Sequence, residues 1–237
     1  MLNHLIIEPM SEDLILWRCL HGGALCEGNI DNPRPDAQLD WPALRARNVP
    51  LLKKLINTYG SAAIAARDRD KVVAMLRFYP KTLCSFSDAG IGFCLQQAFP
   101  AGPKEELIAR DFPPVEKLRD RTLFAHCMMV VSPKEEPDRY RRQGLAVRMV
   151  REMIRWARAY GWHCIETAAY EEIPLLYAIS GSAGRKFWEK MGFRLVLQDR
   201  EPGIKGELLE KVKNEAVAAG IPAERAANRY RMRLELV

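Results

Sequence analysis

Apolar residues recur at helical spacing in one long stretch of the chain. They stand at i, i+3, i+4, i+7, i+8 and i+11 in this order: Ala146, Met149, Val150, Met153, Ile154 and Ala157. This spacing places them along one side of an α-helix. Charged residues, mostly arginines, fill the other side, and Gly161 follows as a C-terminal stop. The pattern predicts an amphipathic helix that packs one face on a core.

Two apolar runs flank this helix in the sequence. Residues 123–131 precede it and end at Ser132-Pro133, and residues 162–168 follow it. Short runs of this kind are typical of strands buried on both faces. The order strand, loop, helix, strand predicts a βαβ crossover, in which ligands bind at the carboxyl ends of the strands.

Turn signals and alternation predict further elements on both sides of that unit. Residues 62–66 and 72–78, joined by the polar turn 67–70, are typical of a hairpin. We also expect a strand over residues 5–7, a helix starting at Ser11, helical structure over 41–59 with a break or kink near Pro50, a helix over 204–219, and a half-buried strand over 231–236.

The loop before the amphipathic helix carries the most specific local chemistry. From Tyr140 to Ala146 it contains Arg141, Arg142 and Gly144. The first N–H groups of a helix lack internal acceptors and carry partial positive charge, and glycine lets a ligand approach the backbone. The two arginines can add charge-assisted hydrogen bonds. We predict a pyrophosphate site; from these residues alone, a solvated arginine face on an ordinary strand–turn–helix is the alternative.

A second motif runs from Ser182 to Phe193. It predicts a short helix that Ser182 caps and Gly192 ends, followed by a strand over residues 193–197. With Arg-x-x-Gly-x-Ala in the first loop and Val-Ser-Pro before it, the chain resembles the GNAT acetyltransferase superfamily. The short helix matches the family pattern Tyr-x-Lys-x-Gly-Phe, except that Trp188 replaces the tyrosine. The resemblance implies an α/β fold with a mixed, centrally splayed β-sheet flanked by helices.

Several segments are longer than the resemblance leads one to expect. Insertions fall between strands 3 and 4 (about residues 80–121), after strand 5 (about 170–181) and at 200–228, and residues 134–138 lengthen the approach to the phosphate loop. The first two are expected to shape the acceptor site, with apolar walls from Phe86, Phe93 and Phe99. Covering sheet edges or forming a homodimer contact is the alternative. Because no linker divides the chain, we expect a single domain over residues 1–237.

The resemblance implies acetyl-CoA or coenzyme A as the acyl donor. Backbone groups of Met129, Val130 and Val131 would bind the pantetheine arm as an added strand. The remaining cofactor contacts are expected from Arg141, Arg142, Gln143, Gly144, Leu145, Ala146, Phe187 and Lys190. Among these, the amides of residues 143–146 would bind the pyrophosphate, and Lys190 or a nearby arginine would reach the adenosine phosphate.

The implied reaction is direct attack of a neutral amine on the thioester in a ternary complex, which requires a proton acceptor. His126 is one candidate, although alternation turns it away from the usual base positions, Ala125 and Cys127, unless a bulge intervenes. A packed core histidine is the alternative. Glu166, Glu171 or Glu172 could accept the proton through water, with a solvated carboxylate as the alternative for each. Tyr177 or Tyr170 could replace the missing tyrosine as the acid that protonates the thiolate, or the thiolate could leave without help from the protein.

The lengthened segment after the fifth strand carries the candidate acceptor-binding residues. Tyr170, Glu171 and Glu172 are the side chains that a protonated amine would meet, through cation–π contact and ion pairing. The acceptor itself stays open among a small amine, an antibiotic, a peptide N-terminus and a lysine.

Composition changes this picture little. The net charge is +6, but the basic residues gather around the phosphate loop and on one helix face, so nucleic acid is an unlikely partner. The cysteines and histidines form no metal-binding spacing, so no metal is expected. Without a membrane-spanning run or secretory signal, we expect a cytoplasmic enzyme. Two other classes stay open: a non-catalytic acyl-CoA-binding or sensing module, and a phosphate- or nucleic-acid-binding α/β protein.

Overall fold

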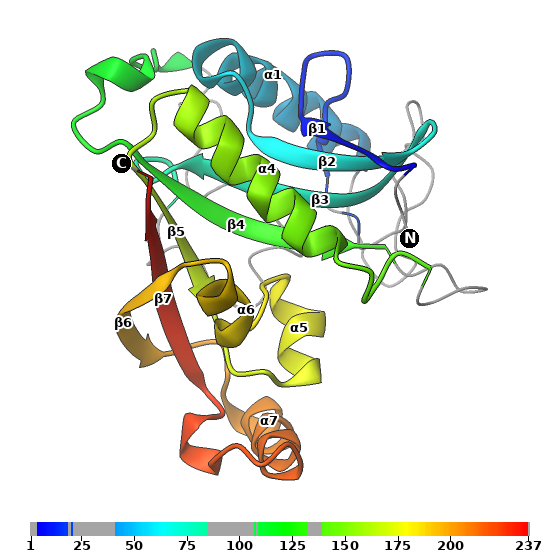
Figure 1. Cartoon of the computed structure of the whole chain (residues 1–237), viewed down its shortest axis with the longest axis vertical. Helices are drawn as coiled ribbons and strands as arrows, with labels where there is room; N and C mark the ends of the chain where they lie inside the picture. The colour runs from blue at the N-terminus through cyan, green and yellow to red at the C-terminus, as the bar shows by residue number, and fades with distance from the viewer. Residues whose placement is uncertain are drawn as a thin grey trace.

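The computed structural model describes residues 4–18, 20, 41–84, 107, 109–131 and 139–236. Seven strands form one sheet, shown in Figure 1: β1 (Ile6–Pro9), β2 (Ala63–Asp68), β3 (Lys71–Pro80), β4 (Thr122–Val130), β5 (Cys164–Ala169), β6 (Arg194–Arg200) and β7 (Asn228–Glu235). The α-helices are α1 (Trp41–Tyr59), α4 (Leu145–Ala159), α5 (Pro174–Ser180), α6 (Arg185–Lys190) and α7 (Gly206–Ala218).

The sheet has the strand order β1-β2-β3-β4-β5-β7-β6. All neighbouring strands are antiparallel except β4 and β5, which are parallel and joined by the α4 crossover. The β4–β5 pairing covers only Thr122 to Ala125 of β4, although that strand continues to Val130. The structure therefore confirms the expected α/β fold with a mixed sheet that splays at its centre.

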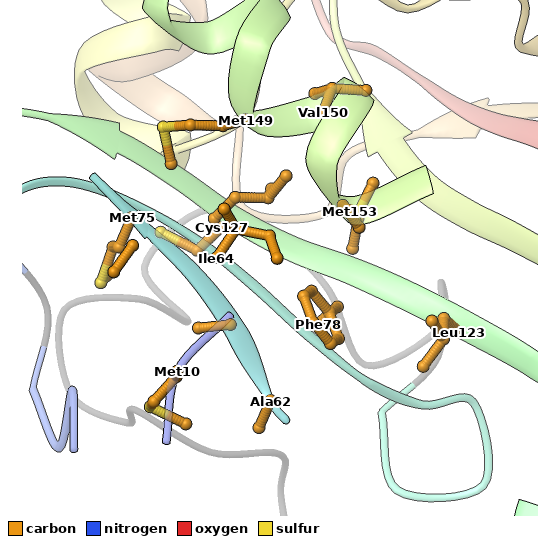
Figure 2. Packing of buried hydrophobic residues seen from close by; sticks show 14 of the residues in the cluster. Met10, Ala62, Ile64, Met75, Phe78, Leu123, Cys127, Met149, Val150 and Met153 are labelled. Atoms are coloured by element: carbon orange, nitrogen blue, oxygen red, sulfur yellow. The ribbon is translucent and has the colours of Figure 1, made fainter. Parts of the chain in front are cut away.

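Helix α4 packs against the sheet and closes one side of the core. Figure 2 shows Met149, Val150 and Met153 turned toward the strands near Phe78 and Leu123. The ring of Trp156 lies 4.7 Å from that of Phe78. The buried face of α4 also includes Leu145, whereas Ala146 and Ile154 are only half-buried. The amphipathic helix is thus confirmed, with its buried face rotated slightly from the predicted stripe.

Most other predicted elements are confirmed within a few residues. The hairpin forms from β2 and β3, and the last predicted helix is α7. The helix expected over 41–59 is α1, which continues through Pro50 without the break that was one of the two predicted outcomes there. Gly161 and Gly192, predicted to end helices, have φ angles of 77° and 89°. The proposed apolar walls Phe86, Phe93 and Phe99, like residues 132–138, lie outside the described residues.

Two local predictions were wrong. Residues 11–18 contain turns and no helix, because side chains from other elements bind their carbonyl groups. Arg77 donates to the carbonyls of Leu16 and Arg18, and Asn48 donates to that of Trp17. Helix α6 begins after Gly184, because the hydroxyl of Ser182 donates to the carbonyl of Ala168 instead of capping the helix.

The part of the sheet around β6 and β7 has its own small core. Tyr170, Ile173 and Leu176 pack there with α7 and the segment before β7. Strand β6 is the edge strand beyond β7, and its pairing is interrupted by a bulge at Val196. Among the described residues, no helix combines the length and the apolar character that crossing a membrane requires.

Candidate functional site

The candidate site begins where β4 and β5 separate. Ala125 pairs with Thr167, and no pairing between the two strands extends beyond it. Strand β4 is buried up to Cys127 and half-buried from Met128 to Val130. Parallel strands that part at their carboxyl ends leave main-chain groups available for a ligand.

The peptide groups along this gap do not all face it. The Val131 N–H donates to the Val73 carbonyl at 2.9 Å. Because every second residue of an antiparallel strand directs its N–H and C=O to the same neighbour, the peptide groups of Met129 also face β3. Met128 and Val130 therefore direct their peptide groups away from β3. The Met128 N–H already donates to the Gly181 carbonyl at 2.7 Å. Of the three residues predicted to bind pantetheine, Val130 has the geometry for main-chain bonds, and the others can contribute side chains.

The predicted phosphate loop is open and shaped by left-handed residues. Arg142 has a φ of 58° and Gly144, at the N-terminus of α4, a φ of 76°. A Cβ placed on Gly144 would meet no heavy atom within 4 Å. Residues 141–144 are exposed, and the Gln143 side chain donates to the Arg139 carbonyl at 2.8 Å. The amides at the start of α4 can therefore face an anion, with Arg141 and Arg142 beside them.

A bulge in β4 falls at His126. Cys127 pairs with Arg77 and Ala125 with Phe78, so that His126 is an extra residue in β4. Its ring lies 6.1 Å from that of Tyr79, which pairs with Phe124. Because Phe78 packs on α4, His126 and Tyr79 lie on the opposite face of the sheet. The bulge occurs at the predicted residue, but His126 still lies on the face opposite to Ala125, as alternation alone expects, and its catalytic role remains a prediction.

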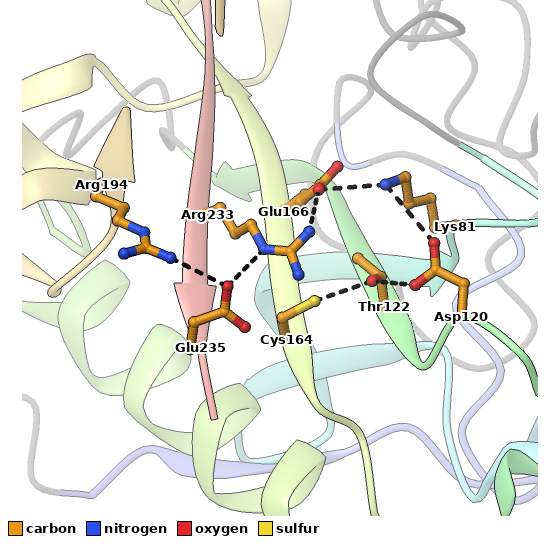
Figure 3. A network of polar contacts seen from close by, with 8 residues as sticks. All are labelled: Lys81, Asp120, Thr122, Cys164, Glu166, Arg194, Arg233 and Glu235. Carbon is orange, nitrogen blue, oxygen red and sulfur yellow. Dashed lines mark hydrogen bonds and ion pairs between the residues drawn. The ribbon is translucent and has the colours of Figure 1, made fainter. Parts of the chain in front are cut away.

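Glu166 lies on the same face as His126, one strand away. It pairs with Phe124, and directly opposed residues share a face. Its side chain is only 1% exposed, and its Oε1 accepts from Lys81 Nζ at 3.2 Å and from Arg233 Nη1 at 2.9 Å. Figure 3 shows the second carboxylate oxygen turned away from both cations. That Oε2 atom is buried and has no hydrogen-bond partner among the described residues.

Tyr170 and Glu171, two of the predicted acceptor-binding residues, are buried in internal networks. The Tyr170 hydroxyl donates to Glu201 Oε2 at 2.8 Å, and burial, followed by the charge of Glu201, raises the pKa of this phenol. Glu171 accepts a hydrogen bond from Tyr230 and pairs with Arg225 at 2.6 Å. The first network joins the residue after β5 to the residue after β6, and the second joins the same segment to β7 and to the residues just before β7.

Glu172 and Tyr177 lie together at the start of α6. A Cβ on Gly184 would lie 2.5 Å from the Tyr177 hydroxyl and 2.6 Å from Glu172 Oε1. The same Oε1 accepts from the Lys186 N–H at 2.6 Å. Burial, followed by the charge of Glu172, raises the pKa of Tyr177 to about 12, so this phenol is protonated at neutral pH. With 41% of its surface exposed, Tyr177 could donate to a ligand.

The two adjacent glutamates are expected to respond differently to loss of charge. Glu172→Gln keeps an oxygen for the Lys186 N–H and removes only the negative charge. We therefore expect KM for a cationic amine to rise about threefold to fivefold, while KM for acetyl-CoA changes less than about threefold. Glu171→Gln should instead lower the free energy of unfolding by about 1–3 kcal/mol, since its charge compensates buried partners. Steady-state kinetics and denaturant unfolding of both variants test this. Unchanged amine KM in Glu172→Gln excludes this carboxylate from acceptor binding.

Trp188 occupies the position where the resemblance expects a tyrosine. Its side chain is 1% exposed and packs between the rings of Phe187, at 5.3 Å, and Phe193, at 4.8 Å. Its indole N–H has no hydrogen-bond acceptor among the described residues, and an indole does not release its proton near neutral pH. Lys190, at the end of the same helix, is exposed. Trp188 therefore has the surroundings of a packing residue.

Replacing Trp188 should affect stability more than turnover. We expect Trp188→Phe to lose about 1–2 kcal/mol of unfolding free energy, because the smaller ring leaves part of the space empty. Its kcat should stay within about threefold of the parent, and Trp188→Tyr should be tolerated. Thermal unfolding and initial rates measure the two effects. A several-hundredfold fall in kcat for the phenylalanine variant, at unchanged CoA affinity, would reveal a chemical role for the indole.

The contacts made by Gly181, Lys81 and Arg233 had no signal in the sequence. Gly181 ends α5 with a φ of 62°, and its carbonyl reaches β4 across the gap. Lys81 and Arg233 are distant in the chain and converge on Glu166 only through strand order. Among the described residues, no group of three or more histidine, cysteine, aspartate or glutamate side chains could bind a metal ion.

Comparisons with known proteins give matches in structure only. No model of a known protein family matches the chain, and no curated protein matches its sequence. Solved structures resemble it over nearly its full length, and they include an N-acetyltransferase and putative acetyltransferases.

Three of these structures show the extent of the likeness. An N-acetyltransferase from Staphylococcus aureus Mu50 has a TM-score of 0.49 and 10% identity, covering 98% of this chain and 99% of its own. A putative acetyltransferase from Salmonella typhimurium, solved with acetyl-CoA, has a TM-score of 0.48 and 13% identity, covering 99% and 95%. A putative GNAT-family acetyltransferase from Desulfovibrio desulfuricans has a TM-score of 0.46 and 12% identity, covering 98% and 99%.

Proposed function

We propose that this protein is an N-acetyltransferase that transfers an acetyl group from acetyl-CoA to an amine. The observation that carries the proposal is the parallel pair β4–β5, which separates after Ala125 and is followed by an open helix N-terminus at Gly144. The gap offers main-chain groups to an extended ligand, and the helix start offers amides to its phosphates. Acetyl-CoA combines an extended amide-containing arm with a pyrophosphate.

The residues present fit such a ligand. Val130 directs its N–H and C=O toward the gap and would bind the pantetheine amides. The amides of Gln143 to Ala146 would bind the pyrophosphate, and Gly144, whose φ of 76° favours glycine, has no side chain to obstruct that approach. The exposed cations Arg141, Arg142 and Lys190 would neutralise the remaining phosphate charge.

The acceptor would approach from the face that carries His126. Acetyl-CoA supplies an activated thioester carbonyl, which the neutral amine attacks as the carbon–sulfur bond breaks. We assign the amine's proton to His126, because its ring lies on this face, beside the gap. Glu166 is the second candidate, acting through water, since its unpartnered oxygen is enclosed. Tyr177, which is protonated at neutral pH, would supply a proton to the departing thiolate.

A non-catalytic acyl-CoA-binding module is the second candidate function. The specific observation in its favour is the hydrogen bond from the Met128 N–H to the Gly181 carbonyl. That N–H lies next to the bulge and faces the gap, where it could otherwise stabilise an oxyanion. In the bonded arrangement it is not available for catalysis.

Nucleic-acid binding is less well supported, because arginines on α4 have partners within the chain. Arg148 donates to the Leu5 carbonyl, Arg155 pairs with Glu152, and Arg158 donates to the Leu236 carbonyl. These contacts orient part of the basic face toward the protein itself.

A turnover assay separates the two main candidates. The purified protein is incubated with acetyl-CoA and a panel of small amines, peptides with free N-termini and lysine peptides, and free thiol and acetylated product are measured. Continuous release of thiol with a matching acetylated amine supports the proposal. Saturable binding of CoA without product from any acceptor, including those in cell extract, favours the non-catalytic module. Absence of CoA binding refutes both.

A further inference from the structure

Asp68 connects the β2–β3 hairpin to the segment that leads into α4. It is the last residue of β2, and its Oδ2 accepts from the Tyr140 hydroxyl at 2.7 Å. Arg139 Nη2 lies 3.3 Å from the same oxygen, and His4 Nε2 lies 3.7 Å from Oδ1. One carboxylate thus contacts both residues that directly precede the exposed residues 141–144 of the phosphate loop.

The phosphate loop needs such support from outside. Arg142 has a φ of 58°, and a non-glycine residue in this region costs about 1–2 kcal/mol. Residues 141–144 are exposed and pack little, whereas Tyr140 is buried with the Arg139 guanidinium 5.3 Å from its ring centre. The buried tyrosine and its hydroxyl contact therefore form the fixed end of the loop.

We propose that Asp68 is a positioning residue that acts through Tyr140 to order the loop 141–146 for pyrophosphate binding. The identity of the ligand rests on the proposed function; the role of Asp68 goes beyond it. A loop ordered before binding loses less conformational entropy when the ligand arrives, which increases affinity. The same carboxylate engages Arg139 and leaves Arg141 and Arg142 as the exposed cations of the loop.

The charge on Asp68 persists under ordinary assay conditions. The hydrogen bond from Tyr140, together with the charges of His4, Arg139 and Arg69, lowers the pKa of this carboxyl, while burial opposes the shift. A folded-state pKa below the unfolded one gives stability that is fully present above the unfolded pKa and is lost as the pH falls through the folded one. The contact should therefore be intact at neutral pH.

Removing either partner should weaken CoA binding and loosen the loop. We expect Tyr140→Phe and Asp68→Ala to raise the Kd for CoA about fivefold to tenfold by calorimetry, a change of the size that loss of one intramolecular hydrogen bond typically causes. In the absence of CoA, amide hydrogen exchange at residues 143–146 should accelerate in both. Asp68→Asn keeps an oxygen that accepts from Tyr140 and should restore most of both properties.

A matched control removes a carboxylate charge from α4 instead of β2. Glu152 pairs with Arg155 at 2.5 Å and lies within α4, outside the loop. Glu152→Gln should therefore leave the CoA affinity and the amide exchange at residues 143–146 unchanged. The role of Asp68 is refuted if Tyr140→Phe and Asp68→Ala bind CoA within twofold of the parent, or if exchange at residues 143–146 does not change. A parent protein that fails to bind CoA refutes the proposed function, and exchange alone then decides whether Asp68 orders the loop.

Discussion

Gly144→Glu should reduce the affinity for CoA at least about 100-fold, which corresponds to about 2.7 kcal/mol. Gly144 has a φ of 76° and stands at the N-terminus of α4. A glutamate there places a negative charge and a side chain where the pyrophosphate would bind. The space around Gly144 is open, so the fold should survive with a backbone penalty of about 1–2 kcal/mol. Calorimetry with CoA measures the affinity.

The other end of the same helix provides the control. Gly161 has a φ of 77°, and a Cβ there would also meet no heavy atom within 4 Å. Gly161→Glu therefore adds the same charge with similar backbone strain, about 22 Å from the loop along a helix of this length. It should lose comparable stability and keep its CoA affinity. Equal affinity in the two variants would show that the pyrophosphate binds elsewhere.

His126→Gln should lower kcat about 100-fold to 1,000-fold and leave KM for acetyl-CoA nearly unchanged. General base catalysis typically contributes rate factors in this range. Glutamine retains a polar side chain of similar length but cannot take up a proton at neutral pH. The loss should be accompanied by disappearance of the acid limb in the pH dependence of kcat/KM. Initial rates across a pH series, with the best acceptor from the panel, measure both.

His163→Gln is the matched control for this experiment. His163 is exposed and lies 3.3 Å from Arg121, before β5 and away from the bulge. Its replacement should leave kcat and the pH profile as in the parent. If His126→Gln retains more than half of the turnover, His126 is a packed histidine beside Tyr79. Glu166→Gln then becomes the decisive variant for the proton acceptor.

The elements that could be predicted from the sequence are those determined by local pattern. Apolar spacing predicted α4, and Gly161 and Gly192 take the left-handed conformation expected after a helix. Alternation around a polar turn predicted the β2–β3 hairpin. In each case the signal and the structure lie within a few residues of one another. The open loop before α4 belongs to this class, because Gly144 and its neighbours are contiguous, and its binding of phosphate stays a prediction.

Features that depend on distant contacts could not be predicted in this way. Tyr170 and Glu171 belong to a polar segment, yet they are buried because Glu201, Arg225 and Tyr230 contact them from later elements. The helix expected to start at Ser11 does not form, because Arg77 and Asn48 from later elements bind main-chain carbonyls of residues 16–18.

The bulge at His126 is intermediate between these two classes. Its occurrence was a stated condition of the prediction, but only the register against β3 shows where the extra residue falls. The sequence therefore identified His126 as a candidate base, and only the pairing of β4 with β3 shows on which face of the sheet it lies.

The position of β7 between β5 and β6 has a consequence for synthesis on the ribosome. Strand β7 is the last strand in chain order, and β6 pairs with it alone. While the chain is being made, β6 therefore has no partner until residues 228–235 have left the exit tunnel. During that interval Leu195, Val196 and Leu197 form an unpaired apolar edge, the kind of segment that promotes aggregation of nascent chains. The arginines at both ends of β6 oppose such contacts through charge repulsion until β7 arrives.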